Sequence, residues 1–269
     1  MAHVPEEGAT LSGRTALAIF AHPDDESLAC GGTLARLADS GVRVVLMCAS
    51  RGERGSTTDP TLAGATLGAA RTDELHEAAK VLGASAVIIL DHPDGSLRWA
   101  DVDELHEEIL NAVKEYSPDL VITFDEDGLY WHDDHIGMYE RTQTAIHTLG
   151  PAGPVLYYVT MPPGVMRDLT DTAVAEGWVP PGSTPFGIAP GVFGLETDIP
   201  TLAVDVSAWV PRKLDALRCH RTQMGPTNPF ARLDPAQARR WIGIERFRRD
   251  PFSVGGSLLE QIGEPVLSS

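Results

Sequence analysis

Residues 15–41 read TALAIFAHPDDESLACGGTLARLADSG, and this stretch decides the fold. It opens with an apolar run, 15–20, that lacks polar alternation, which is typical of a strand buried on both faces. A helical pattern follows over 27–40, with Cys30, Leu34 and Leu37 on one face and Gly41 as its natural stop. A buried strand leading directly into a helix predicts the first half of a β–α–β unit.

The same alternation repeats along the first 160 residues. Further apolar runs at 43–49, 86–90, 120–124 and 155–159 predict strands, and helical patterns lie at 71–82, 102–116 and 134–149. Repeated strand–helix–strand units imply parallel strands with right-handed crossovers. We therefore expect an α/β fold, a Rossmann-like and mostly parallel sheet flanked by helices. Ligands bind such sheets at the carboxyl ends of the strands.

The rest of the chain has a different character. Residues 161–200 are rich in proline and glycine and show no clear period, so we expect an irregular excursion with short strands near 187–193. A strand at 201–206 and helices at 211–220 and 235–242 follow. We expect one domain over 1–269, with a core at 15–223, the insertion at 161–200 and a basic helical segment at 212–249.

Charge excludes several classes of partner. The chain carries 21 Lys and Arg against 38 Asp and Glu, a net charge of −17. This argues against sequence-independent binding to nucleic acid and against docking on an anionic membrane. Residues 212–249 reverse the balance, with ten basic and three acidic side chains, and we interpret them as a solvated face or a contact to the acidic body.

Cysteine content and the start of the chain bear on its location. Three widely spaced cysteines form no disulfide framework, and the start of the chain has neither a signal-peptide pattern nor a membrane span. We therefore expect a cytoplasmic protein. Whether it forms a homo-oligomer is left open.

Two clusters of histidine and aspartate fall where the strands end. The first is His22-Pro23-Asp24-Asp25-Glu26, directly after the first strand. An acidic helix cap would need one carboxylate, whereas three stand here beside a histidine. The second cluster is Tyr130-Trp131-His132-Asp133-Asp134-His135, at the start of a predicted helix. Imidazole and carboxylate are good Zn²⁺ ligands, and three protein ligands with one open position form the catalytic pattern.

The two clusters resemble those of the LmbE-like/PIG-L family of zinc-dependent N-deacetylases. Four further features carry the resemblance: Gly31-Gly32, the Arg51-Gly52-Glu53 turn, the helix that starts at Ala70-Arg71 and the segment 220–223. The resemblance spans residues 15–223. It implies one Zn²⁺ per chain and a small-molecule substrate, an N-acetylglucosamine-type sugar or related glycoconjugate. The implied roles are zinc ligation by His22, Asp25 and His135, general base catalysis by Asp24, a place beside the scissile group for His132, orientation of that histidine by Asp134, and substrate binding by Arg51.

Some assignments stay open at this point. The family commonly has proline where Asp133 stands, so either Asp133 or Asp134 could partner a histidine, although the register favours Asp134. A protonated His132 or the Tyr130 hydroxyl could donate to the oxyanion of the transition state.

Rival functions remain as well. One is an amidase that cleaves a larger acyl group or a thiol-sugar conjugate. Another is a non-catalytic carbohydrate-binding protein, for which loss of a ligand or of Asp24 would be the signature, and neither is missing. A nucleotide-binding domain is disfavoured because no glycine-rich phosphate loop follows the first strand.

Overall fold

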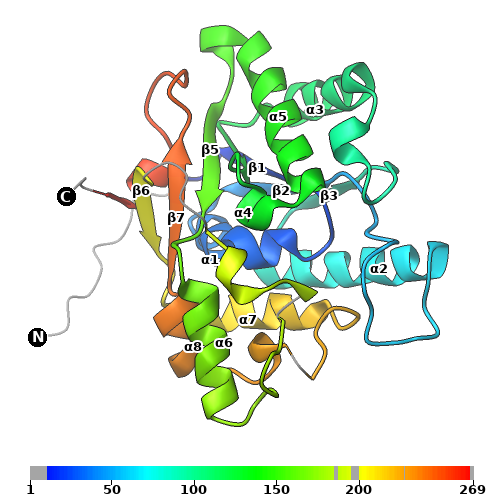
Figure 1. Cartoon of the computed structure of the whole chain (residues 1–269). Coiled ribbons are helices and arrows are strands. Elements are labelled where there is room, and N and C mark those ends of the chain that lie inside the picture. Colours follow the sequence, from blue (N-terminus) through cyan, green and yellow to red (C-terminus); the bar gives the residue numbers. More distant parts are fainter. Residues whose placement is uncertain (1–10, 185–186, 195–199, 227, 267–269) are drawn as a thin grey trace, which may run out of the picture.

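One eight-stranded sheet organises the computed structural model, which describes residues 11–184, 187–194, 200–226 and 228–266 (Figure 1). The strand order is β3-β2-β1-β4-β5-β7-β6-β8. The first five strands in this order are parallel, and the other three extend the sheet by antiparallel pairing. The strands are β1 (Thr15–Phe20), β2 (Arg43–Cys48), β3 (Ala86–Ile89), β4 (Leu120–Phe124), β5 (Val155–Thr160), β6 (Leu202–Asp205), β7 (Ile244–Arg249) and β8 (Glu264–Pro265).

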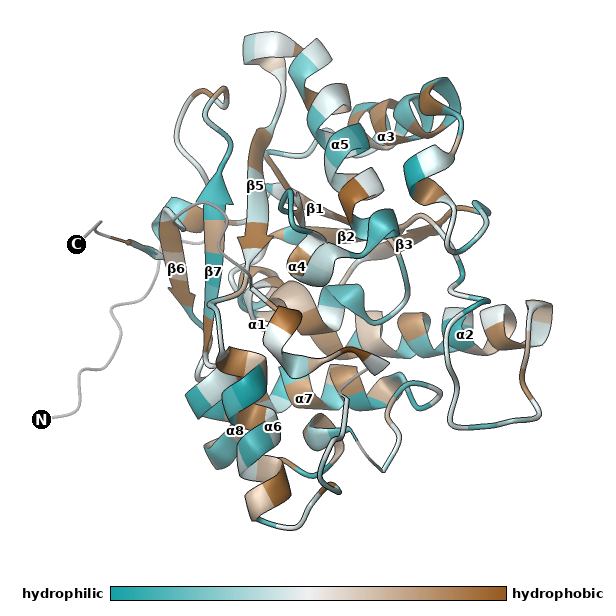
Figure 2. Ribbon diagram, viewed as in Figure 1, coloured by the Kyte–Doolittle hydropathy of each residue, from teal (hydrophilic) through white to brown (hydrophobic). Residues whose placement is uncertain are grey.

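Helices cover both faces of the sheet. They are α1 (Asp25–Asp39), α2 (Ala65–Leu82), α3 (Val102–Tyr116), α4 (Gly128–Trp131), α5 (Asp133–Thr148), α6 (Val165–Ala175), α7 (Val210–Cys219) and α8 (Pro235–Ile242). Helices α3 and α5 pack together on one face, and α1 and α2 lie on the other, with α7 packed against both (Figure 1). Figure 2 shows hydrophobic colour along β1, β2 and β3; β1 and β2 are buried between these layers, and β3, at the edge of the sheet, is half-buried.

The predicted α/β fold class is confirmed. Strand β1 has the expected bounds, and all six of its residues are buried. It pairs in parallel with β2 on one side and β4 on the other, so it lies inside the sheet rather than at an edge. This central place explains the continuous apolar run, because a strand with neighbours on both sides and helices on both faces has no solvent-facing side.

The region 161–200 differs from the expectation. Helix α6 forms there, and its residues Met166, Leu169 and Ala173 are buried at helical spacing. The short strands expected near 187–193 are absent from the described residues of that range, and a 3₁₀ helix occupies Pro190–Val192 instead. The prolines and glycines that flank α6 suggested an irregular segment, so this 11-residue amphipathic helix was not predicted.

Strand β7 was also missed, because its sequence Ile-Glu-Arg-Phe-Arg-Arg is rich in charge. Its burial alternates, with Glu245 and Phe247 facing inward, and two of its arginines have carboxylate partners. Basic residues of 212–249 pair with the acidic body through Arg212–Asp39 (2.5 Å) and Arg221–Glu77 (2.5 Å). The basic segment is thus in part a contact to the acidic body.

Among the described residues, no helix combines the length and the apolar character that crossing a bilayer requires. The domain bounds given above stay a prediction.

Candidate metal centre and active site

The two histidine–aspartate clusters meet at the carboxyl ends of β1 and β4, as the parallel strands predict. His22 follows β1, and His135 lies in the first turn of α5. The ring of His135 stacks on Phe124, the last residue of β4, with centroids 4.0 Å apart. This stacking and the complete burial of His135 fix the plane of its ring.

In each histidine, a hydrogen bond to the outer ring nitrogen determines which nitrogen faces the candidate metal centre. His135 Nδ1 lies 3.0 Å from the Gly128 carbonyl, to which it donates, so Nε2 keeps its lone pair. His22 Nε2 lies 3.0 Å from Asp134 Oδ2, which leaves Nδ1 as the free acceptor. Such outer partners are the usual way in which proteins orient histidine ligands.

Three donor groups converge on one point. His22 Nδ1 is 3.2 Å from His135 Nε2 and 3.4 Å from Asp25 Oδ2, and Asp25 Oδ1 is 3.2 Å from His135 Nε2. Ligands bound tetrahedrally at about 2.0–2.1 Å would be separated by about 3.3–3.4 Å. Asp25 presents a different oxygen to each histidine, and the three side chains form a triangle whose closest contacts match the spacing of ligands around a tetrahedral metal.

Carboxylates around His22 also favour a positive charge at this place. Burial lowers the pKa of His22, but its bonds to Asp134, Asp25 and Asp94 outweigh this and raise the pKa well above its ordinary value. A divalent cation at the centre would satisfy the same negative groups. Two other close groups of donors share His22, one with His132 and His135 and one with Asp94 and Asp134. Asp134 and Asp94 approach Nε2 of His22, opposite the nitrogen that faces His135, so they act as its outer partners.

Asp24 lies beside this triangle in a strained backbone conformation, with φ at 113°. A non-glycine residue adopts such an angle only where its surroundings hold it. Arg71 from α2 donates to the Pro23 carbonyl (2.5 Å) and to Asp24 Oδ2 (3.2 Å), and the Glu26 carboxylate accepts from the Asp24 amide (3.1 Å). Burial raises the pKa of Asp24 to about 6, against the opposing charge of Arg71. A carboxylate that titrates near neutrality suits a general base.

Tyr130 of α4 and His132, which joins α4 to α5, lie beside the same centre. The Asp134 amide donates to His132 Nδ1 (3.2 Å), so the neutral ring carries its hydrogen on Nε2. Burial and the charges of His135 and His22 lower the pKa of His132 to about 4, so this environment favours the neutral ring over the protonated donor considered above. Tyr130 packs against His135 and Phe193 with centroids 5.0 and 4.9 Å apart.

The structure settles two contacts differently from the sequence-based expectation. The Asp134 carboxylate does not orient His132; it holds His22 and accepts from the Gly95 and Leu97 amides. Arg51 donates to Asp91 (2.6 Å) and Thr72 (3.1 Å), and it is not among the described residues that line the cavity at the centre. The substrate-binding role predicted for Arg51 therefore has no geometric support here.

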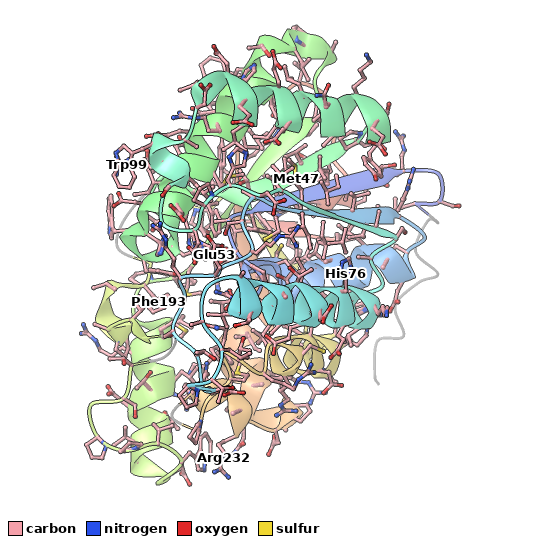
Figure 3. All side chains as sticks on the ribbon, turned by 90° about the vertical axis from the view of Figure 1, so that its right-hand side faces the viewer. Met47, Glu53, His76, Trp99, Phe193 and Arg232 are labelled. Carbon is pink, nitrogen blue, oxygen red and sulfur yellow. The ribbon has the colours of Figure 1, made fainter. Side chains whose placement is uncertain are left out.

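A cavity of about 190 Å³ opens over these groups. Arg71, Asp94 and Gln223 also line this cavity, although the sequence suggested no site role for any of them. Asp94 contacts His22 Nε2 at 3.1 Å, and its amide donates to Glu53, which Figure 3 labels on the loop after β2 (2.9 Å). The His-Pro-Asp order at 92–94, which repeats that at 22–24, was a signal for Asp94.

Comparisons with known proteins agree with this site. The family model described as GlcNAc-PI de-N-acetylase (PIG-L) matches residues 17–146, which include both clusters. The chain is 33% identical to the 1D-myo-inositol 2-acetamido-2-deoxy-alpha-D-glucopyranoside deacetylase of Kineococcus radiotolerans, over 78% of this chain and 69% of that protein. The chain belongs to the PIG-L family. It is accordingly a hydrolase of the deacetylase class, and PIG-L deacetylases are metal-dependent.

Solved structures place the PIG-L fold in context. The N,N'-diacetylchitobiose deacetylase of Pyrococcus horikoshii matches with a TM-score of 0.62 and 25% identity, over 88% of this chain and 84% of that one. The 4-carboxy-2-hydroxymuconate hydratase of Pseudomonas putida KT2440 matches with a TM-score of 0.64 and 21% identity, over 91% and 99%. Because the same fold carries a hydratase, the chemistry has to be argued from the site rather than from the fold.

Proposed function

We propose that this chain is a zinc-dependent enzyme that removes the acetyl group from an N-acetylglucosamine-type sugar, with His22, Asp25 and His135 holding the metal. The observation that carries the proposal is the approach of the three donor side chains to within 3.2–3.4 Å of one another, beside Asp24 on an open cavity. The names of the PIG-L relatives support the substrate class, since they are deacetylases of 2-acetamido sugars. Two nitrogens and a carboxylate with an open position are typical of catalytic zinc.

The reaction is hydrolysis of an amide. Water supplies a hydroxyl group to the acyl carbon, the carbon–nitrogen bond breaks, and the products are acetate and a free amine. A zinc ion bound at the three ligands would polarise the carbonyl and lower the pKa of water. Asp24 takes the proton of the attacking water, which its raised pKa near 6 allows at neutral pH, and returns it to the nitrogen as the carbon–nitrogen bond breaks.

His132 and Tyr130 provide donors to the developing oxyanion. The neutral His132 ring presents its Nε2 hydrogen toward the cavity, because Nδ1 accepts from the Asp134 amide. The Tyr130 side chain lines the same cavity, and burial raises its pKa well above the ordinary value, so its hydroxyl keeps its hydrogen. Preorganised donors of this kind stabilise a tetrahedral intermediate.

Asp134 acts one step further out, as a positioning residue for His22. Its two oxygens accept from the Gly95 and Leu97 amides while Oδ2 holds His22 Nε2. Asp133 is half exposed and pairs with Arg98 (2.6 Å), which leaves Asp134 as the histidine's partner. Loss of such an outer carboxylate typically costs about 10–100-fold in metal affinity.

The experiment compares Asp24→Asn with Asp133→Asn, a matched change in the second cluster, away from the donor triangle. Metal content and release of amine from N-acetylglucosamine and its glycosides are measured on purified protein. We expect about one zinc per chain in both variants and a loss of roughly 10²–10⁴-fold in turnover for Asp24→Asn alone. Zinc-free protein, or full activity of Asp24→Asn, would refute the proposal. Amine release only from larger acyl or thiol conjugates would indicate an amidase instead.

Location is proposed on a separate observation. All three cysteines, Cys30, Cys48 and Cys219, are free thiols. Free thiols suit a reducing compartment, so we propose the cytoplasm.

A further inference from the structure

His220 is a buried histidine that takes no part in the chemistry proposed for the site. It follows α7 directly, α7 packs along α1, and the His220 side chain is completely buried (Figure 1). Its Nε2 lies 2.9 Å from Glu26 Oε1 and 3.5 Å from Ser27 Oγ. Among the described residues its Nδ1 has no partner, so the polar contacts of the ring side chain are all made toward the start of α1.

The Glu26 carboxylate connects this ring to the backbone of Asp24. Its Oε1 accepts from His220 Nε2 and from the Ser27 hydroxyl (2.5 Å), and its Oε2 accepts from the Asp24 amide (3.1 Å). The Glu26 side chain is 3% exposed, so water has little access to these hydrogen bonds. If the carboxylate turned away, the Asp24 amide would lose the acceptor that it has here.

Stability alone does not explain a histidine–carboxylate pair at this position. In a buried site, well-packed apolar side chains of similar volume are often as stable as an ion pair, or more stable. Apolar side chains could not accept from the Asp24 amide, however, and Asp24 has a φ of 113°. A residue other than glycine keeps such an angle only where its surroundings hold it. The pair therefore lies where the strained backbone needs support.

We propose that His220 and Glu26 are positioning residues for the general base. His220 orients the Glu26 carboxylate, and Glu26 holds the strained Asp24 backbone that places the base beside the three metal-binding side chains. Arg71 contacts the Asp24 carboxylate from α2 (3.2 Å), so the base is held through its side chain by one helix and through its backbone by the start of another. The inference rests on the proposed deacetylase function, because it takes Asp24 as the base.

Three variants test the pair, and a fourth is their control. His220→Leu removes the donor to Glu26, whereas His220→Gln keeps an N–H donor near the position of Nε2. Glu26→Gln keeps the size of the side chain, but its single carbonyl oxygen cannot accept from both His220 and the Asp24 amide. Thr222→Val is the matched control, because it also removes one side-chain donor from a buried carboxylate, that of Glu74 (2.7 Å), in the same segment.

The first measurement is steady-state hydrolysis of N-acetylglucosamine, with turnover expressed per bound zinc. Neither His220 nor Glu26 is among the described residues that line the cavity, so KM should stay within about twofold in every variant. In His220→Leu and Glu26→Gln, kcat should fall by about 10²-fold, the loss expected when a reacting group is misplaced. His220→Gln should be at least about tenfold faster than His220→Leu because it restores one hydrogen bond to a charged group. Thr222→Val should keep the kcat of the unaltered protein.

The second measurement needs no turnover. Hydrogen exchange at the Asp24 amide is followed by NMR on the purified protein. The exchange should be at least about tenfold faster in His220→Leu and Glu26→Gln, since the amide loses a charged acceptor. In Thr222→Val it should not change.

The outcomes separate this inference from the proposed function. Unchanged kcat in His220→Leu and Glu26→Gln, equal kcat in the two His220 variants, or an equal loss in Thr222→Val overturns the positioning role and leaves the deacetylase. A change confined to KM overturns it as well, because that indicates a contact with substrate. If His220→Leu does not fold, Glu26→Gln carries both measurements. If the unaltered protein releases no amine from any N-acetyl sugar, the proposed function fails, and exchange at the Asp24 amide alone decides whether the pair holds this backbone: an unchanged rate refutes it.

Discussion

Removing the Glu245 carboxylate should destabilise the fold more than any loss of a surface charge. Helix α1 is kinked at Cys30, where φ is −146°, so the helix cannot supply acceptors for the amides just beyond. Glu245, on β7, takes their place: Oε1 accepts from the Gly32 amide (2.9 Å) and Oε2 from the Thr33 amide (2.7 Å). Lys213 donates to the same carboxylate, and both side chains are 2% exposed.

The magnitude follows from what Glu245→Ala leaves behind. Two buried amides lose their acceptor, and the Lys213 ammonium loses its counter-charge. Breaking a buried ion pair from one side costs about 3–5 kcal/mol. Glu77→Ala is the matched control, because Glu77 and Arg221 are about half exposed and exposed ion pairs contribute little to stability.

Urea denaturation measures both effects, with the free energy of unfolding obtained by linear extrapolation. Glu245→Ala should lose about 3–5 kcal/mol, and Glu77→Ala should lose far less. The Lys213→Met/Glu245→Gln double variant, which leaves no unpaired buried charge, should recover part of the loss. Equal effects of Glu245→Ala and Glu77→Ala would refute the capping role of this carboxylate.

Three further results are expected. Gly32→Ala should cost about 1–3 kcal/mol in the same denaturation assay, because its Cβ would lie 2.6 Å from Val206 Cβ; an unchanged unfolding midpoint would contradict this close approach. Arg51→Ala should leave KM within about twofold, since its guanidinium is held by Asp91 outside the cavity; a tenfold rise in steady-state KM would restore its predicted role in substrate binding. Removing metal with a chelator should lower Tm, and zinc should restore it, because ligand binding at 100 times Kd adds about 2.7 kcal/mol; a Tm indifferent to metal would argue against an ordered metal centre.

The parallel half of the sheet was predictable because its strands are buried on both faces and carry continuous apolar runs. The same rule brought His22 and His135 to one edge, since both follow neighbouring parallel strands. The hydrogen-bond partners of the site's side chains could not be predicted from the strand pattern. Asp134 was expected to serve His132, but the loop that carries Gly95 and Leu97 folds over its carboxylate and turns it toward His22. That loop is distant in sequence, so no local pattern could reveal the contact.

Arg71 shows a second limit of local patterns. It lies on the apolar-patterned helix α2, where a charged residue normally faces solvent, yet it is 4% exposed. Its guanidinium spans the Pro23 and Gly52 carbonyls and the Asp24 carboxylate, which belong to two different loops. The need for an arginine at this position arises only when the fold brings those two loops together, because its guanidinium then bonds to both of them.

The uneven distribution of charge between the acidic N-terminal half and the basic segment 212–249 has a structural explanation. The N-terminal half supplies the carboxylates that surround His22, and their repulsion would oppose folding without positive groups nearby. Arg71 meets Asp24 at 3.2 Å within this half, but Asp125, fully buried after β4, is paired by Arg248 from β7. Glu245 and Lys213 likewise tie the kinked helix α1 to the C-terminal strands. The basic segment therefore supports the helix and strand ends on which the two site clusters lie. Changes in residues 212–249 should accordingly affect metal binding without touching a ligand.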